Sequence, residues 1–397
     1  MERITFKKDS GESYSAPIKT ILSDIFEIRD DKNNGNYGKE SVLSVSDESG
    51  IVNQIEFQGR SFAGDDLSKY KVVSTGNIVY TRSPLKLKPF GIIKLVDSEI
   101  GIVSPLYIVN VPKHDFDSRY LYYCFDSPQR TNDYLRALVR KGAKNTMNIS
   151  DSEWLSGTIF ISREPEEQKK IGSLLATLDE KIILEKNKVE KLKALKASMI
   201  TKMFPKEGQN VPEIRFQRFS GEWKKSKLGH ISEYIREAGT GCNYVGTDNM
   251  YKHCGGVDFS NDLQKKGIKY KVGDVLVSNI RPYLEKAWLA DRDGVCSTDV
   301  IVFRFTECMP EFGYIMLSDK KFFDYVMTAV GGSKMPRGDR KHIAEMPIMI
   351  PPTKAEMCDI FNVIRTIEKK IELHKYKVEK LINIKKALLE KLIGGEN

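Results

Sequence analysis

The sequence predicts an α+β protein built from two tandem mixed α/β domains, each followed by one long helix. The first observation is an internal repeat, because the peptide Lys188-Val189-Glu190-Lys191-Leu192 recurs letter for letter at residues 377–381. The surrounding segments match at a constant offset of 189 residues without a gap. The second observation is that both copies carry a heptad-like apolar pattern, and the third is that similar strand-like runs precede them in the same order. Such a duplication predicts pseudo-twofold symmetry and two similar surfaces for an extended partner.

Composition limits the class of protein. The chain has 397 residues, enough for two to four domains, and a net charge of +9, which favours a polyanionic partner such as nucleic acid. No apolar run approaches the roughly 18 residues that cross a bilayer, and no signal-peptide core is found at the N-terminus. The six cysteines contain no C-x-x-C pair. We therefore expect free thiols and a protein of a reducing cytoplasm.

The first domain is predicted to be a series of short strands, one helix and one strand, broken by Gly, Pro and Asp. Strand-like runs lie at residues 51–57, 77–81, 91–96 and 106–111. They are followed by a helical stretch at 118–138, a basic glycine loop at 140–145 and a strand at 157–161.

The second domain is predicted to repeat that order with different loop side chains. The corresponding segments lie at residues 273–277, 294–297, 312–329, 331–337 and 346–352. One scaffold with unlike loops is typical of two related domains with different specificities. The resulting division is a first domain at 1–165, a helix at 166–204, a linker at 205–220, a second domain at 221–352 and a helix at 353–393.

The two long helices are expected to pair as an antiparallel coiled coil, since an isolated helix with one apolar stripe needs a partner. Two polar residues interrupt each stripe at matching places: Glu185 and Lys196 in the first, His374 and Lys385 in the second. A register in which paired residue numbers sum to 570 places Glu185 against Lys385 and Lys196 against His374. The alternative is that these side chains extend to solvent from a loose seam.

Three motifs carry a resemblance to a known family. The first helix opens with Pro165-Glu166-Glu167-Gln168-Lys169-Lys170-Ile171, and the linker contains Arg215-Phe216 followed by Phe219-Ser220-Gly221-Glu222-Trp223. Both helices also have Lys-rich ends. With these motifs the chain resembles the specificity (S) subunit of type I restriction-modification enzymes over nearly its whole length. It departs from the family at Ala355-Glu356-Met357 and at the N-terminus, where an Arg-Phe…Gly-Glu-Trp segment is not found.

The resemblance implies a non-catalytic DNA-reading subunit with two target-recognition domains, one for each half of a bipartite asymmetric site. The helices would act as a ruler and as the dock for two modification (methyltransferase) subunits, and through them for restriction (motor and nuclease) subunits. No cofactor is expected on this chain, whereas S-adenosylmethionine, ATP and Mg²⁺ are expected on the partners. The sequence contains neither a phosphate loop nor an Asn/Asp-Pro-Pro-aromatic methyltransferase motif, which agrees with catalysis elsewhere.

Candidate DNA contacts lie in equivalent loops of the two halves, where Lys and Arg would neutralise phosphates and Arg or Asn could read base edges. In the first half they are Arg82, Lys86, Lys88, Arg140, Lys141, Lys144 and Asn145. In the second half they are Asn279, Arg281, Tyr283, Lys334, Arg337, Arg340 and Lys341.

Other interpretations remain. The chain could be a freestanding regulator that binds two half-sites without enzymatic partners, or a coiled-coil scaffold whose basic charge is incidental. Cys242, His253 and Cys254 have no standard zinc spacing, so we expect ordinary thiols and no metal site. Asp339 and His342 are not accompanied by a nucleophile, which argues against a catalytic pair.

Overall fold

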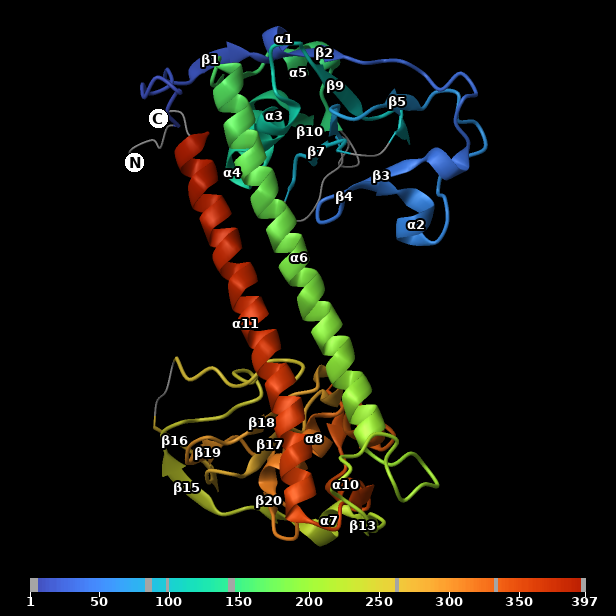
Figure 1. The fold of residues 1–397 in the computed structure, drawn as a ribbon, viewed down its shortest axis with the longest axis vertical. Helices are drawn as coiled ribbons and strands as arrows, with labels where there is room; N and C mark the ends of the chain where they lie inside the picture. Colours follow the sequence, from blue (N-terminus) through green and yellow to red (C-terminus); the bar gives the residue numbers. More distant parts are fainter. Residues whose placement is uncertain are drawn as a thin grey trace. The chain divides into compact units, whose positions relative to one another are not determined.

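The computed structural model describes residues 6–82, 88–97, 100–141, 147–260, 264–331 and 335–393. The chain divides into two compact units, one formed by Met1–Glu185 with Tyr376–Asn397 and the other by Lys186–Lys375. Each unit contains one α/β domain and half of each long helix, α6 (Pro165–Met203) and α11 (Lys354–Leu392) (Figure 1). In the part of the chain that the structure describes, no helix is long and apolar enough to cross a membrane.

The first unit is organised around a four-stranded antiparallel sheet in the order β2-β9-β6-β7, formed by Phe26–Ile28, Ile108–Pro112, Ile78–Tyr80 and Ile93–Leu95. Asn110 is fully buried in this sheet, and its side chain is satisfied on both sides. It donates to the Ile78 carbonyl at 2.9 Å and accepts from the Trp154 indole at 2.6 Å. A buried amide with both partners in place fixes the position of the helix that carries Trp154.

Smaller two-stranded ladders surround this sheet. They pair β1 (Ile18–Ile21) with β12 (Thr158–Ile161), β3 (Leu43–Ser46) with β4 (Gly50–Asn53), β5 (Lys71–Val73) with β8 (Gly101–Val103), and β10 (Arg140–Lys141) with β11 (Met147–Asn148). The helices are α1 (Leu22–Ile25), α2 (Gln54–Gln58), α3 (Ser118–Phe125), α4 (Pro128–Leu138) and α5 (Asp151–Leu155), with a 3₁₀ turn η1 at Lys39–Ser41.

The second unit repeats the topology. Its main sheet has the order β14-β20-β17-β18, formed by Ser232–Ile235, Val300–Phe305, Val275–Ser278 and Ala287–Leu289. Around it lie β13 (Lys224–Lys227) with β23 (Pro347–Ile350), β15 (Ala238–Gly241) with β16 (Lys265–Tyr270) and β19 (Gly294–Cys296), and β21 (Val330–Gly331) with β22 (Arg337–Gly338). The helices are α7 (Leu228–Ile231), α8 (Pro310–Ser318), α9 (Lys320–Met327), α10 (Arg340–Ala344) and the 3₁₀ helix η3 (Pro282–Leu284). The mixed α/β domains and the internal repeat predicted from the sequence are confirmed.

Three predicted elements were wrong in detail. The helix expected at 118–138 is two helices, because Pro128 lacks the N–H that a continuous helix needs and begins α4 instead. The helix expected at 312–329 breaks at Asp319, whose carboxylate caps α9 by accepting from the Lys321 amide. The strand expected at 51–57 ends at Asn53, whose side chain caps α2 in the same way.

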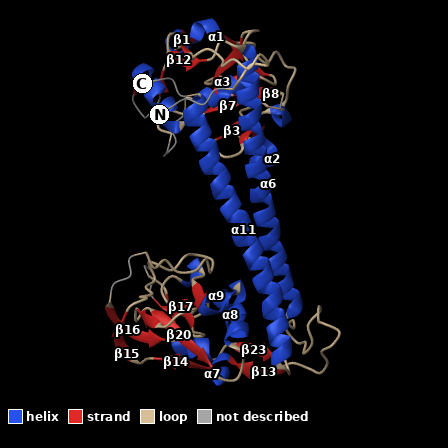
Figure 2. Ribbon diagram, turned by 60° about the vertical axis from the view of Figure 1, so that its left-hand side comes forward, coloured by secondary structure: helices blue, strands red, loops and turns tan. Residues whose placement is uncertain are grey.

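Each unit packs its two half-helices onto its own domain (Figure 2). In the first unit Ile171 and Leu175 of α6 join Leu389 and Leu392 of α11 in one buried cluster with residues of the main sheet. In the second unit the corresponding cluster contains Ile200 and Met203 of α6 with Met357 and Ile360 of α11. Burial of these stripes removes apolar surface from water, which supplies the main stabilisation of helices this long.

A lysine–carboxylate contact joins the half-helices in each unit. In the first unit Lys385 Nζ lies 2.7 Å from Asp126 Oδ2 and 2.7 Å from Asp179 Oδ1. In the second unit Lys196 Nζ donates to Glu368 Oε1 at 2.7 Å. Lys196 and Lys385 are equivalent at the repeat offset, as are Asp179 and Glu368, so one interaction occurs twice.

These contacts correct the predicted register. The residue numbers of both ion pairs sum to 564 and not to 570, so the partners Glu185 for Lys385 and His374 for Lys196 were each placed six residues too far along. The prediction paired only residues within the apolar seam. Lysine side chains are long enough to reach carboxylates beside the seam, and Asp179 and Glu368 lie there.

The segment that leads into each domain is also repeated. Before the second domain, Arg215 makes a bidentate pair with the buried Glu356 at 2.8 and 2.9 Å, and the Trp223 indole donates to the same carboxylate at 3.1 Å. Before the first domain, Tyr14 is buried and donates to Glu166 at 3.3 Å. The N-terminus thus has a similar buried aromatic residue that the sequence analysis missed, but its carboxylate partner Glu166 precedes Glu167, the repeat equivalent of Glu356.

The missed signal was a short peptide. Ser10-Gly11-Glu12 matches Ser220-Gly221-Glu222, and both glycines adopt left-handed φ angles, 87° and 83°. One residue, Ser13, lies between Glu12 and Tyr14, whereas Trp223 follows Glu222 directly. The inserted residue and the change of Trp to Tyr hide the Gly-Glu-Trp pattern in the first copy.

Candidate nucleic-acid interface

A braced turn follows β17 in the second unit. The turn η3 is flanked by Arg281 and Glu285, whose φ angles are both 51°, a left-handed conformation that non-glycine residues seldom adopt. Strained residues of this kind persist where the surrounding structure fixes them, and they concentrate at functional sites. The turn presents Tyr283 with its side chain 52% exposed.

A second strained pair holds this turn in place. His253 and Cys254 both have φ of 53°, and their backbone amides donate to the carbonyls of Leu284 at 3.1 Å and Glu285 at 2.8 Å. The His253 ring nitrogen Nδ1 also lies 2.8 Å from the Glu285 carboxylate. His253 and Cys254 thus have a structural task. Together with Cys242 they form no potential metal cluster within the described residues.

Basic residues gather around the turn. The Arg281 amide donates to the Pro336 carbonyl at 2.9 Å, and Ile280 forms a bridge with Arg337, so the turn lies beside β22. Burial lowers the pKa of Lys286, and the positive charges of Lys252 and Arg281 lower it further. Lys252 and Arg281 beside Lys286 give this face several neighbouring cations, a grouping that favours an anionic ligand.

The start of α10 adds two more cations. The Arg340 guanidinium donates to the Thr298 carbonyl at 3.1 Å, and the Arg337 guanidinium lies 3.1 Å from the Asp299 carboxylate. Lys341 is exposed on the same helix. Asp339 is the N-cap of α10 and accepts from the Lys341 amide at 2.7 Å, which gives it a structural explanation and not a catalytic one.

Asn279 and His342 complete the neighbourhood. The Asn279 side-chain oxygen is buried and has no hydrogen-bond partner among the described residues, while its backbone amide donates to Asp299 at 2.8 Å. The His342 ring stacks on Tyr325 with centroids 4.3 Å apart and lies 3.0 Å from the Thr328 hydroxyl. His342 is accordingly a packing residue of α10.

The equivalent residues of the first unit have acidic partners. Arg82, at φ 53°, directs its guanidinium to Asp151 at 2.5 Å, and its Nε is buried without a partner among the described residues. Lys88 lies 2.5 Å from Asp47. The structure therefore places these two predicted contacts at the surface of the first domain but with their charges already compensated.

The remaining predicted residues are only partly described. Arg140 and Lys141 form β10, which pairs with β11, and the structure describes their backbone only. Lys86, Lys144, Asn145 and Lys334 lie outside the described residues altogether.

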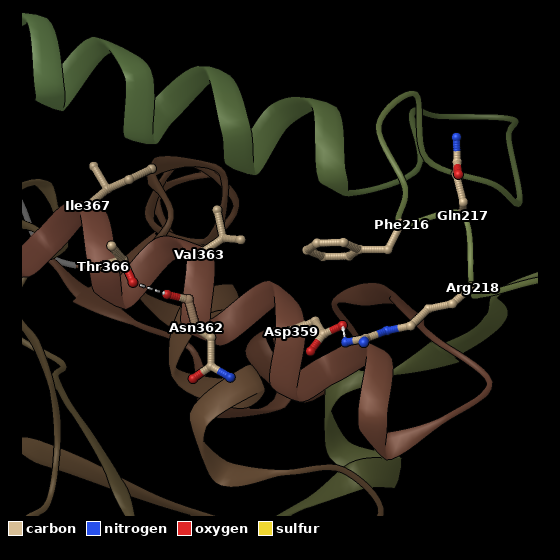
Figure 3. A pocket seen from close by; sticks show the side chains of 8 residues that line it. All are labelled: Phe216, Gln217, Arg218, Asp359, Asn362, Val363, Thr366 and Ile367. Carbon is tan, nitrogen blue, oxygen red and sulfur yellow. Dashed lines mark hydrogen bonds and ion pairs between the residues drawn. The ribbon is translucent and has the colours of Figure 1, made fainter.

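An open hollow lies between the linker and α11 in the second unit (Figure 3). Phe216 faces Val363 and Ile367 across it, and Arg218 forms an ion pair with Asp359 at its rim. The Arg218 guanidinium also lies 5.8 Å from the Phe216 ring centroid. The hollow is apolar at its base and charged at its edge, as protein-docking surfaces commonly are.

Comparison with known proteins identifies relatives of one kind, although no family model matches the chain. The EcoDI specificity subunit of Escherichia coli is 26% identical over 134 residues, which cover 32% of this chain and 29% of that protein. The MjaIX specificity subunit of Methanocaldococcus jannaschii is 24% identical over 328 residues, covering 72% and 70% respectively. The chain thus spans less than a third of the length of the first relative.

Solved structures share the fold. The S subunit of a type I restriction-modification system from M. genitalium aligns over the full length of both chains with a TM-score of 0.65 and 13% identity. A chain from a structure of an assembled type I restriction-modification system aligns over 96% of this chain and 98% of its own, with a TM-score of 0.52 and 15% identity. With the repeated α/β domains and the long helices, these comparisons confirm the resemblance predicted from the sequence: the chain is similar in sequence to specificity subunits of type I restriction enzymes and shares the fold of a type I restriction-modification S subunit.

Proposed function

We propose that this chain is the DNA sequence-specificity subunit of a type I restriction-modification complex and reads a bipartite asymmetric site. Residues 1–165 and 221–352 would be its target-recognition domains, joined by the linker 205–220, and the helices its spacers. The observation that carries the proposal is the repeated sheet whose matched loops, after β6 and β17, hold unlike side chains. Two domains of one scaffold with different loops suit two different half-sites.

The proposed DNA surface of each domain is the loop after the third strand of the main sheet together with the following basic hairpin. In the second unit Arg281, Arg337, Arg340 and Lys341 converge there beside the exposed Tyr283. Arginines at such a surface neutralise phosphates and can hydrogen-bond guanine. Asn279 is a proposed base contact through its side-chain nitrogen, since its side-chain oxygen is buried. Lys334 and the basic loop with Lys144 belong to the same proposal by their position in the sequence.

The proposed partners are two copies of a methyltransferase subunit, and restriction subunits through them. Apolar side chains are exposed at repeat-equivalent positions of both helices: Leu184 and Leu373 at 58% and 51%, and Leu195 and Ile384 at 46% and 47%. The first unit exposes Leu184 on α6 and Ile384 on α11, and the second unit exposes Leu195 on α6 and Leu373 on α11. Identical exposed positions in two repeats suit two copies of the same partner.

The proposed chemistry resides on those partners. The chain itself would recognise DNA without catalysing a reaction. S-adenosylmethionine, ATP and Mg²⁺ would act on the methyltransferase and restriction subunits, in the bacterial cytoplasm. The partner would extrude and methylate an adenine in each half-site, since a base inside the duplex is out of reach of a methyltransferase.

Co-expression with an adenine methyltransferase encoded beside this chain tests the proposal. We expect a stable complex that methylates DNA at a split sequence and loses that specificity without this chain. A chain that binds DNA but recruits no methyltransferase would support a freestanding regulator instead. A chain that binds neither DNA nor methyltransferase would support a coiled-coil scaffold.

A further inference from the structure

The two arginines at the matched turns, Arg82 and Arg281, differ in their electrostatic surroundings. Each follows the third strand of its sheet, β6 or β17, and each has a left-handed φ, 53° and 51°. Both arginines therefore lie in strained turns after equivalent strands, Arg82 two residues after β6 and Arg281 three residues after β17. The side chains around each arginine decide what its guanidinium can contact.

The short helix beside each turn carries the difference. Asp151 and Arg340 are equivalent at the repeat offset of 189, and each is the first residue of its helix, α5 or α10. Asp151 holds the Arg82 guanidinium at 2.5 Å. In the second unit the same position holds a cation, which cannot pair with Arg281.

Burial follows the same division. The Arg82 side chain is 25% exposed, and its Nε is buried with no partner among the described residues. The Arg82 charge also acts on Tyr80, a fully buried ring whose pKa burial raises. Arg281 is exposed, and within the described residues its guanidinium makes no hydrogen bond or ion pair. Arg82 thus points toward protein and Arg281 toward solvent.

We propose that the matched turns divide two tasks: Arg281 is a DNA-phosphate contact of the second recognition domain, whereas Arg82 is a positioning residue that Asp151 withholds from DNA. The inference rests on the proposed function and adds that the two domains contribute unequally to the electrostatic attraction of DNA. The second turn contributes electrostatic attraction, and the first contributes mainly shape and hydrogen bonding to its half-site. A guanidinium already neutralised by a carboxylate releases few counterions when DNA approaches.

Reciprocal charge changes in the full chain provide the test, measured as affinity for a duplex containing the recognised site over a range of salt concentrations. Arg281→Gln should weaken binding roughly tenfold and lower the salt slope by about one, because one phosphate contact is lost. Arg82→Gln should leave the slope unchanged. Asp151→Asn should tighten binding several-fold and raise the slope by about one, because Arg82 becomes available. Arg340→Asp should give Arg281 a carboxylate partner, as Asp151 gives Arg82. In that background Arg281→Gln should change the affinity and the salt slope very little.

Thermal unfolding of each variant separates folding defects from lost DNA contacts. Asp151→Asn removes the charge but keeps the side-chain shape, so its effect on binding is easier to interpret than that of the arginine variants. The inference is overturned if Arg82→Gln lowers the slope as much as Arg281→Gln, or if Asp151→Asn leaves binding unchanged in a folded protein. A wild-type chain, alone and with its methyltransferase, that shows no salt-dependent binding of duplex DNA contradicts the proposed function itself.

Discussion

Lys385 of α11 and Asp179 of α6 form an ion pair at 2.7 Å, and the equivalent pair one repeat away is Lys196 with Glu368 at 2.7 Å. The Lys385 pair is the more elaborate, because Asp126 of the first domain joins it. Burial lowers the pKa of Lys385, but the carboxylates of Asp126 and Asp179 outweigh that effect and raise it. This lysine therefore connects both long helices to the α/β domain of the first unit.

Lys385→Met should lower the free energy of unfolding of the chain by about 3 kcal/mol, since it leaves two carboxylates without their buried cation. Lys196→Met is the matched control, with one carboxylate partner, and we expect a loss of about 1 to 2 kcal/mol. Urea denaturation of both variants provides the measurement. Equal losses would show that the Asp126 contact adds nothing.

Arg215→Ala should destabilise the second unit by about 3 kcal/mol, because Glu356 is 1% exposed and would keep the Trp223 indole as its one side-chain donor among the described residues. Arg215→Lys should recover part of the loss, since lysine restores the charge but not the bidentate geometry. Arg218→Gln serves as the control. Its side chain is 65% exposed, so a change below about 1 kcal/mol is expected.

The pair of Asp47 with Lys88 predicts an acid-side pH dependence. Burial raises the pKa of Asp47, but Lys88 and then Lys94 outweigh it and lower the pKa below its ordinary value of 3.8. A lowered carboxylate pKa stabilises the fold above pH 3.8 and loses that contribution as the pH falls through the folded pKa. Wild type and Asp47→Asn should therefore differ in unfolding free energy at pH 6 and converge toward pH 3. A constant difference across that range would argue against the ion pair as the cause.

Leu184→Asp and Leu373→Asp should each remove one of two methyltransferase subunits from the complex, because these residues are exposed at equivalent positions of the repeat. The double variant should lose both. Ile382→Asp is the control, being 45% exposed but equivalent to Lys193 in the other copy. Native mass measurement of the complexes would reveal the stoichiometry, and full occupancy in the double variant would place the dock elsewhere.

The fold could be predicted where the signal extends over many residues. The 39-residue helices α6 and α11 begin and end within one residue of the predicted bounds, because a heptad stripe of that length has no strand alternative. Short elements depend on single caps. The segment after Asn53 is rich in β-favouring residues, yet the Asn53 side chain accepts from two helix amides and α2 forms.

The sequence could predict only part of the candidate site, for a similar reason. Its position was predictable from the repeat, which places Arg82 and Arg281 after equivalent strands. Their different roles depend on Asp151, 69 residues after Arg82, and Arg340, 59 residues after Arg281, which approach the turns only after folding. The register of the helix pair was predicted wrongly for another reason: the lysines reach Asp179 and Glu368, carboxylates beside the apolar seam, and not the polar residues within it.

The central claim is that each domain independently specifies one half of a split DNA sequence. The most direct measurement is methylome sequencing of cells that carry the methyltransferase with either this chain or a chimera in which residues 221–352 come from a relative with a different specificity. We expect one half of the methylated sequence to change while the other half and the spacer length stay the same. A change in both halves, or methylation that is indifferent to the exchange, would contradict the account.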